Sequence, residues 1–140
     1  MIIGIDISEK NNVSAWGDLA KNKIRFAYLK CTDGITSSIP RYASDKKNAK
    51  ENGMLVGAYH WLNPRQDAAA QAEYFIKNAS PSEDDLPPVV CLELYTTTKV
   101  ILEPKLKTFV ETVETHTAKR PILYTSSAYW KKYMSDVEWC

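Results

Sequence analysis

The sequence lacks an apolar run long enough to cross a membrane. Its opening stretch, MIIGIDIS, is also too short for a secretory signal and has no basic start, so we expect a first strand of a protein made in the cytoplasm. An excess of one charge is missing too, because the formal net charge is +1. A basic surface for nucleic acid is therefore not predicted, and neither is membrane insertion.

Cysteine is scarce. Cys31, Cys91 and Cys140 are odd in number and widely spaced, which argues against a disulfide framework. Their spacing is not that of a metal site either. A glycine-rich phosphate loop is absent after the first apolar run, which counts against a nucleotide-binding domain of the flavodoxin type. We expect reduced thiols and no bound metal.

What the sequence does contain is a regular alternation of short apolar runs and longer amphipathic stretches. Strands are predicted at 2–7, 24–30, 55–61, 89–94 and 121–125. Helices are predicted at 13–21, 41–52, from 63 onward, at 104–117 and from 127. In the third helix Asn63 is the expected cap, with Pro64 in the first turn and Gln66 closing a capping box.

Such alternation implies a parallel sheet with right-handed crossovers, in one domain of 140 residues. Two architectures fit this pattern. Length favours a doubly wound open sheet, because a complete (β/α) barrel needs about 200 residues or more. The motifs described below favour a barrel. Strand order distinguishes the two: a partial barrel has its strands in sequential order, whereas a flavodoxin-like sheet has the order 2-1-3-4-5.

Polar and aromatic residues gather where the predicted strands end, which is where parallel α/β folds collect their functional groups. The side chains expected at this rim are Asp6, Lys30, Asp33, Tyr59, Cys91, Glu93 and Tyr124. Aromatic faces stack on sugar rings, and glycoside cleavage needs a carboxylic acid to protonate the leaving oxygen. The rim therefore predicts a carbohydrate site.

Plainer explanations exist for each of these residues. Asp6 alone is compatible with a strand end that binds backbone amides, and Glu93 with a structural ion pair to Lys30. Tyr59 and Tyr124 are equally compatible with packing in a core.

His60 is expected to be a core histidine. Because the third and fourth predicted strands are neighbours, a thiol–imidazole pair of Cys91 and His60 is a remote alternative.

The motifs resemble those of glycoside hydrolase family 25, the lysozyme-type N-acetylmuramidases. They occur in family order as GIDIS at 4–8, AYLKCTDG at 27–34, GAYHWLNP at 57–64, LPPVVCLE at 86–93 and PILYT at 121–125. Gln71 and Ala72 match a pair on the following helix. The resemblance implies a partial TIM-like (β/α) barrel of five parallel βα units, with Glu93 as general acid and Asp6 as its electrostatic partner. Asp33, Tyr59, Tyr124 and Lys30 are then expected to bind substrate.

Two departures from the family pattern stand out. The aspartate of the family's Asp-x-Glu motif is replaced by Cys91, and residues 1–140 are expected to lack the last three strands of the barrel. The family implies hydrolysis of the β-1,4 bond between N-acetylmuramic acid and N-acetylglucosamine in peptidoglycan, without a cofactor. We therefore expect an impaired muramidase that acts at the bacterial cell wall once released. The alternative is a non-catalytic glycan-binding or regulatory remnant. Exposed sheet edges predict either a homo-oligomer that covers them or a local rearrangement of the chain ends.

Overall fold

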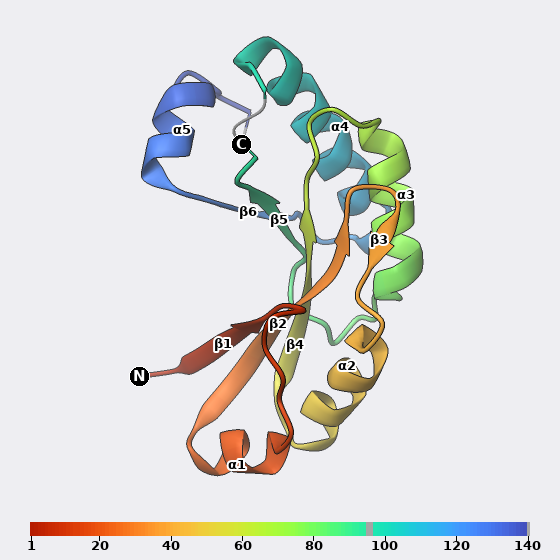
Figure 1. Cartoon of the computed structure of the whole chain (residues 1–140), viewed down its shortest axis with the longest axis vertical. Coiled ribbons are helices and arrows are strands. Elements are labelled where there is room, and N and C mark those ends of the chain that lie inside the picture. Colours follow the sequence, from red (N-terminus) through yellow and green to blue (C-terminus); the bar gives the residue numbers. More distant parts are fainter. Residues whose placement is uncertain (95–96, 140) are drawn as a thin grey trace.

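The computed structural model describes residues 1–94 and 97–139, and its centre is one curled parallel sheet (Figure 1). The sheet has the order β1-β2-β4-β5-β6. Its strands are β1 (Ile3–Ile7), β2 (Ile24–Asp33), β4 (Leu55–Trp61), β5 (Val89–Leu92) and β6 (Ile122–Thr125). A two-residue strand, β3 (Ser37–Ser38), pairs antiparallel with β2. The sequential order confirms the partial barrel and excludes the flavodoxin-like sheet. The sheet is a half-barrel rather than a closed one.

Helices connect and cover the strands. Those in the described part of the chain are α1 (Trp16–Lys21), α2 (Tyr42–Glu51), α3 (Ala68–Ala79), α4 (Lys99–Thr117) and α5 (Ser127–Tyr133). Figure 1 shows α2, α3 and α4 along the convex side of the sheet, which leaves the concave side open. None of the described helices is both long and apolar enough to span a bilayer.

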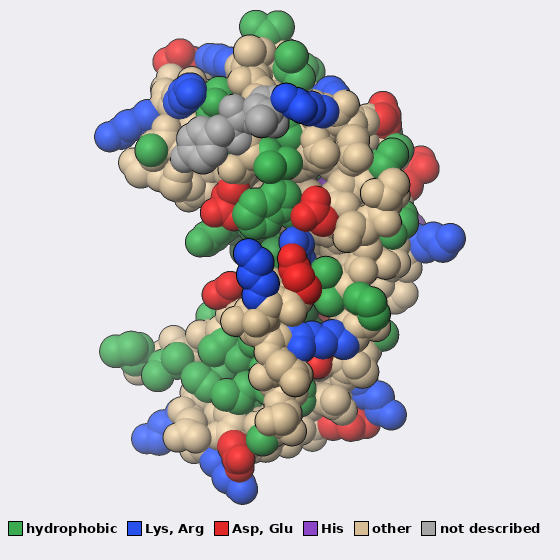
Figure 2. Space-filling view, in the orientation of Figure 1, with side chains coloured by type: hydrophobic (Ala, Val, Ile, Leu, Met, Phe, Trp, Pro, Cys, Tyr) green, Lys and Arg blue, Asp and Glu red, His purple; other side chains and the backbone are tan. Residues whose placement is uncertain are grey.

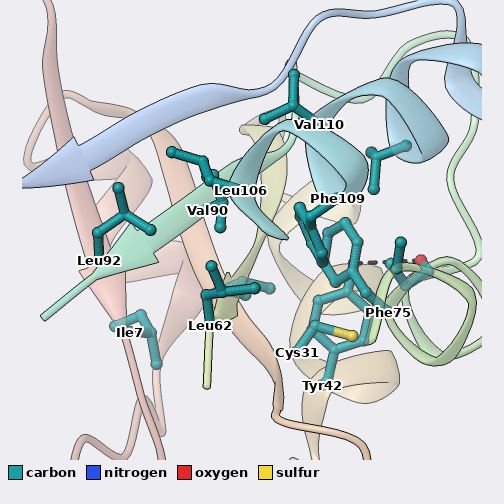
Figure 3. Packing of buried hydrophobic residues seen from close by; sticks show 14 of the residues in the cluster. Ile7, Cys31, Tyr42, Leu62, Phe75, Val90, Leu92, Leu106, Phe109 and Val110 are labelled. Atoms are coloured by element: carbon teal, nitrogen blue, oxygen red, sulfur yellow. Dashed lines mark hydrogen bonds between the residues drawn. The ribbon is translucent and has the colours of Figure 1, made fainter. Parts of the chain in front are cut away.

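The main hydrophobic core fills the space between the convex side of the sheet and the helices (Figure 3). Strand residues such as Leu29 and Val90 meet Leu106 and Phe109 of α4, together with Phe75 of α3, and all five are at most 2% exposed. Burial of each such side chain contributes about 1.5–3 kcal/mol. This core holds the strands in place, so the concave side is available for other uses.

The start of α3 differs from the prediction. The helix begins at Ala68, and its cap is Asp67, whose carboxylate accepts a hydrogen bond from the Ala70 amide at 2.7 Å. Asn63 instead closes a turn, and the Gln66 side chain accepts a hydrogen bond from the Ile35 amide at 2.9 Å. The capping box was wrong because Gln66 is used by a segment distant in sequence.

The start of α4 also differs, since it lies at Lys99 rather than near Pro104. The Thr98 carbonyl accepts hydrogen bonds from the Ile101 and Leu102 amides, and Leu102 is fully buried. Pro104 lies inside the helix and leaves only the carbonyl one turn earlier without its usual partner. Burial of Leu102 favours this extra turn.

Candidate active site

A cleft of about 750 Å³ occupies the concave side of the half-barrel. In the space-filling view the molecule is hollowed there, and acidic, basic and hydrophobic side chains meet in the hollow (Figure 2). All of the rim residues predicted from the sequence line this cleft: Asp6, Lys30, Asp33, Tyr59, Cys91, Glu93 and Tyr124. The fold therefore brings together side chains from β1, β2, β4, β5 and β6, or from the loops that follow them.

A register shift in β2 decides which side chains face the cleft. Between Lys30 and Thr32 the pairing of β2 with β4 skips a residue, as in a β-bulge. Cys31 and Thr32 consequently both face the helices, whereas Lys30 and Asp33 both face the cleft. Strict alternation would have placed Asp33 on the same side as Cys31. The strand was predicted to end at Lys30, and its continuation to Asp33 carries this feature.

Lys30 is the buried cation of the cleft, with a side chain 8% exposed. Its ammonium group lies 3.1 Å from Glu9 Oε1 and 3.2 Å from Asp33 Oδ2. It also lies 5.1 Å from the centroid of the Trp61 ring, in cation–π range. Within the described residues, Lys30 forms no ion pair with Glu93, so the structural pair considered from the sequence is wrong.

Glu9 and Trp61 are cleft residues that the sequence did not single out. Glu9 follows β1 on an exposed loop, directly after the motif at 4–8 but outside it. Burial acts to raise the pKa of Glu9, but a backbone hydrogen bond and the Lys30 ammonium outweigh it and lower this pKa. The signal was Lys30 itself, because a lysine inside a buried strand requires carboxylate partners.

The centre of the cleft is a small hydrophobic cluster of Tyr59, Val89 and Cys91. Burial raises the pKa of Tyr59, and the neighbouring Cys91, Asp6, Glu9 and Glu93 raise it further. Tyr59 is buried, but it lies on the concave side of the sheet and lines the cleft, so it is not part of the main hydrophobic core.

Glu93 and Tyr124 lie at the outer part of the cleft. Glu93 comes one residue after the end of β5 and is partly buried, so its carboxyl is neither sequestered in the core nor freely solvated. Tyr124 is 58% exposed, which excludes the core role considered for it from the sequence. Asp6 is exposed as well. These three groups are accessible to a large ligand.

Cys91 is a buried free thiol, and burial raises its pKa to about 12. Cys31 is also free and buried, whereas Cys140 lies outside the described residues. His60 is on the other side of the sheet, where its ring nitrogens bond Thr32 Oγ1 at 2.8 Å and Gln71 Oε1 at 3.1 Å. The Cys91–His60 pair is therefore wrong, and His60 is a core histidine, as first expected.

In the described residues, no group of three His, Cys, Asp or Glu side chains is arranged to hold a metal ion. The chemistry available in the cleft is that of carboxylates, tyrosine hydroxyls and the ammonium groups of Lys10 and Lys30, of which Lys30 is paired. Carboxylates beside aromatic faces suit proton transfer to a sugar oxygen.

Fold and cleft together define a (β/α) half-barrel protein with an acidic, aromatic-lined concave face. The profile of the family described as "Glycosyl hydrolases family 25" matches residues 5–139, and the chain belongs to this family. The resemblance seen in the sequence motifs is thus confirmed.

Individual relatives agree with this assignment. The Escherichia coli K12 protein YegX is 28% identical over 99% of this chain and 54% of its own length. Lysozyme M1 of Streptomyces globisporus is 27% identical over 91% of this chain and 47% of its own. The structure of a family 25 glycosyl hydrolase from Bacillus anthracis superposes with a TM-score of 0.93 at 28% identity, covering 99% of this chain and 66% of that one. The chain spans about half the length of the curated relatives it matches.

Proposed function

We propose that this protein is a muramidase-type peptidoglycan hydrolase that cleaves the β-1,4 bond between N-acetylmuramic acid and N-acetylglucosamine. The observation that carries the proposal is that Asp6 and Glu93 line one cleft, at the C-terminal ends of strands in a family 25 half-barrel. A similar lysozyme, Lysozyme M1, supports the choice of substrate. The protein would act on glycan strands of the bacterial cell wall once it reaches them.

Glu93 is the proposed general acid. Its side chain lines the cleft and forms no ion pair with Lys30, so its carboxyl group is available to a leaving oxygen bound there. Asp6, from the first strand, stabilises the positive charge that develops on the sugar ring in the transition state. Tyr59, Tyr124 and Asp33 form the surrounding walls that bind the sugar rings, and Lys30 holds Asp33 in place through an ion pair.

Cys91 is the reason to propose a slow enzyme. It lies two residues before Glu93, in the place of the aspartate in the family motif. With a pKa of about 12 its thiol is neutral near pH 7. A neutral thiol cannot stabilise the positive charge that develops on the sugar ring in the transition state. The same observation favours the second candidate, a protein that binds glycan strands in this cleft without cutting them.

The test is a turbidity assay on purified peptidoglycan, with reducing-end release as a second readout. Glu93→Gln keeps the shape of the side chain but removes the transferable proton, so activity should fall by about 100-fold or more. Glu51→Gln is the matched control: the same chemical change on the exposed surface of α2, where Glu51 lies 3.8 Å from Lys47. It should leave activity unchanged.

Each outcome separates the candidates. Lysis by Glu93→Gln at the parental rate would show that Glu93 is not the acid and would end this mechanism. A parent that lyses nothing but sediments with peptidoglycan would support the binding protein. A parent that neither lyses nor sediments would contradict both candidates.

A further inference from the structure

Most of the hydrogen-bonding capacity of the Lys30 ammonium group is already used within the protein. It carries three N–H donors. Carboxylate oxygens of Glu9 and Asp33 lie 3.1 Å and 3.2 Å away, and the Trp61 ring lies 5.1 Å away at its centroid. A buried ammonium is costly unless it is paired, and here the pairs and the ring account for its surroundings. The groups around Lys30 therefore point to a structural use of its charge.

The backbone turn that carries Glu9 is held by contacts that do not involve Lys30. It lies on a turn in which the Ser8 hydroxyl donates to Asn11 Oδ1 at 3.1 Å and accepts from the Lys10 amide at 3.3 Å. Arg41, at the start of α2, donates to the Ser8 carbonyl at 2.6 Å. Because this turn is anchored, the Glu9 carboxylate is presented to Lys30 from a fixed backbone position.

Trp61 is the group that this arrangement can orient. It ends β4, directly beside Asp33 in the register with β2, and the Gly34 amide donates to its carbonyl at 3.2 Å. Its backbone is thus held by β2, and its ring lines the cleft within cation–π range of Lys30. Stacking on a sugar ring requires an indole held in one orientation, and the ammonium over the Trp61 ring favours such an orientation.

We propose that Glu9 is a positioning residue that, through Lys30, fixes the Trp61 indole as a sugar-stacking wall of the cleft. The affinity of the cleft for glycan then depends on a loop residue that need not touch the reacting bond. This inference rests on the proposed glycan-binding function of the same cleft. Its test therefore needs one readout that involves no glycan.

The readout without glycan is the near-ultraviolet circular dichroism of Trp61, obtained as the difference between the parent and Trp61→Leu. Glu9→Gln should change or abolish this band, because Lys30 then keeps only Asp33 and moves off the ring. Glu9→Asp should restore part of it, since the charge returns on a shorter side chain. Glu51→Gln should leave it unchanged, and thermal unfolding of each variant reports whether the fold is intact.

The second readout is the dissociation constant for the β-1,4-linked tetramer of N-acetylglucosamine, measured by calorimetry on the full chain. Glu9→Gln should weaken binding roughly fivefold in the parent, and by less than about twofold in the Trp61→Leu background, where the ring to be positioned is gone.

Two results would overturn the inference. One is an unchanged Trp61 band in Glu9→Gln. The other is an equal loss of affinity in both backgrounds, because Glu9 or Lys30 would then contact the glycan directly. If the parent does not bind the tetramer, the proposed function is in doubt, and the Trp61 band alone decides whether Glu9 positions the indole.

Discussion

The ring of Tyr28 lies directly over Gly57, its neighbour across β2 and β4. A Cβ atom built at Gly57 would come within 2.1 Å of the Tyr28 ring, so only glycine fits beneath it. The Tyr28 hydroxyl donates to the Pro87 carbonyl at 3.1 Å, just before β5. This ring therefore covers β4 on the concave side and ties the floor of the cleft to the strand that leads to Glu93.

Gly57→Ala should lower the free energy of unfolding by about 1–3 kcal/mol, because the added methyl group forces the Tyr28 ring away from β4. Urea denaturation measures this change. In a Tyr28→Ala background the same substitution should cost little, since the obstructing ring is gone. Equal costs in both backgrounds would show that the ring is not the obstacle.

Cys91→Asp should raise lytic activity. The new carboxylate would lie on the concave side beside Tyr59 and would oppose positive charge developing on the sugar ring. Cys91→Ser is the matched control, because it changes the side chain without adding charge and should not raise the rate. The measurement is the rate of lysis of purified peptidoglycan. No gain with Cys91→Asp would show that Cys91 does not limit the rate.

Stability should fall as the pH drops from about 6.5 to 4, through the titration of His60. Burial first of all lowers the pKa of His60 to about 4. The unfolded chain thus binds a proton in this window that the folded chain does not, and acid favours unfolding. The loss between pH 7 and pH 5 is about 2 kcal/mol at most. Urea unfolding at both pH values measures it, and His60→Gln should show a smaller dependence; an equal dependence would assign it to other groups.

The bare edges of the sheet should make the protein self-associate. Among the described residues β1 pairs only with β2 and β6 only with β5. Apolar side chains are exposed at both strands, with Ile3 at 42% and Ile122 at 47%. Light scattering over a range of concentrations should show a dimer, weakened by Ile122→Lys but not by Val100→Lys, which changes an exposed residue of α4. A monomer at all concentrations would contradict this expectation.

The sequence by itself predicted the strands, their parallel direction and seven of the cleft residues, whereas the structure chose between the two possible strand orders. Apolar runs such as 55–61 have the length and composition of buried strands, and β4 has those bounds. Parallel strands joined by helices must place their C-terminal ends at one edge, so the direction of the strands is enough to predict that Asp6, Glu93 and Tyr124 lie at that edge. These features depend on local pattern and chain direction alone.

Only the tertiary structure decided which of these side chains face one another. The register shift at Cys31 and Thr32 depends on pairing with β4, and it turns Asp33 toward Lys30. Glu9 reaches Lys30 across 21 positions of sequence, and Gln66 reaches Ile35 across 31. Such contacts arise because a buried charge or amide takes its partner from whatever segment packs nearby. The packing of the whole sheet and its helices decides which segment that is. A local pattern in the sequence carries no information about it.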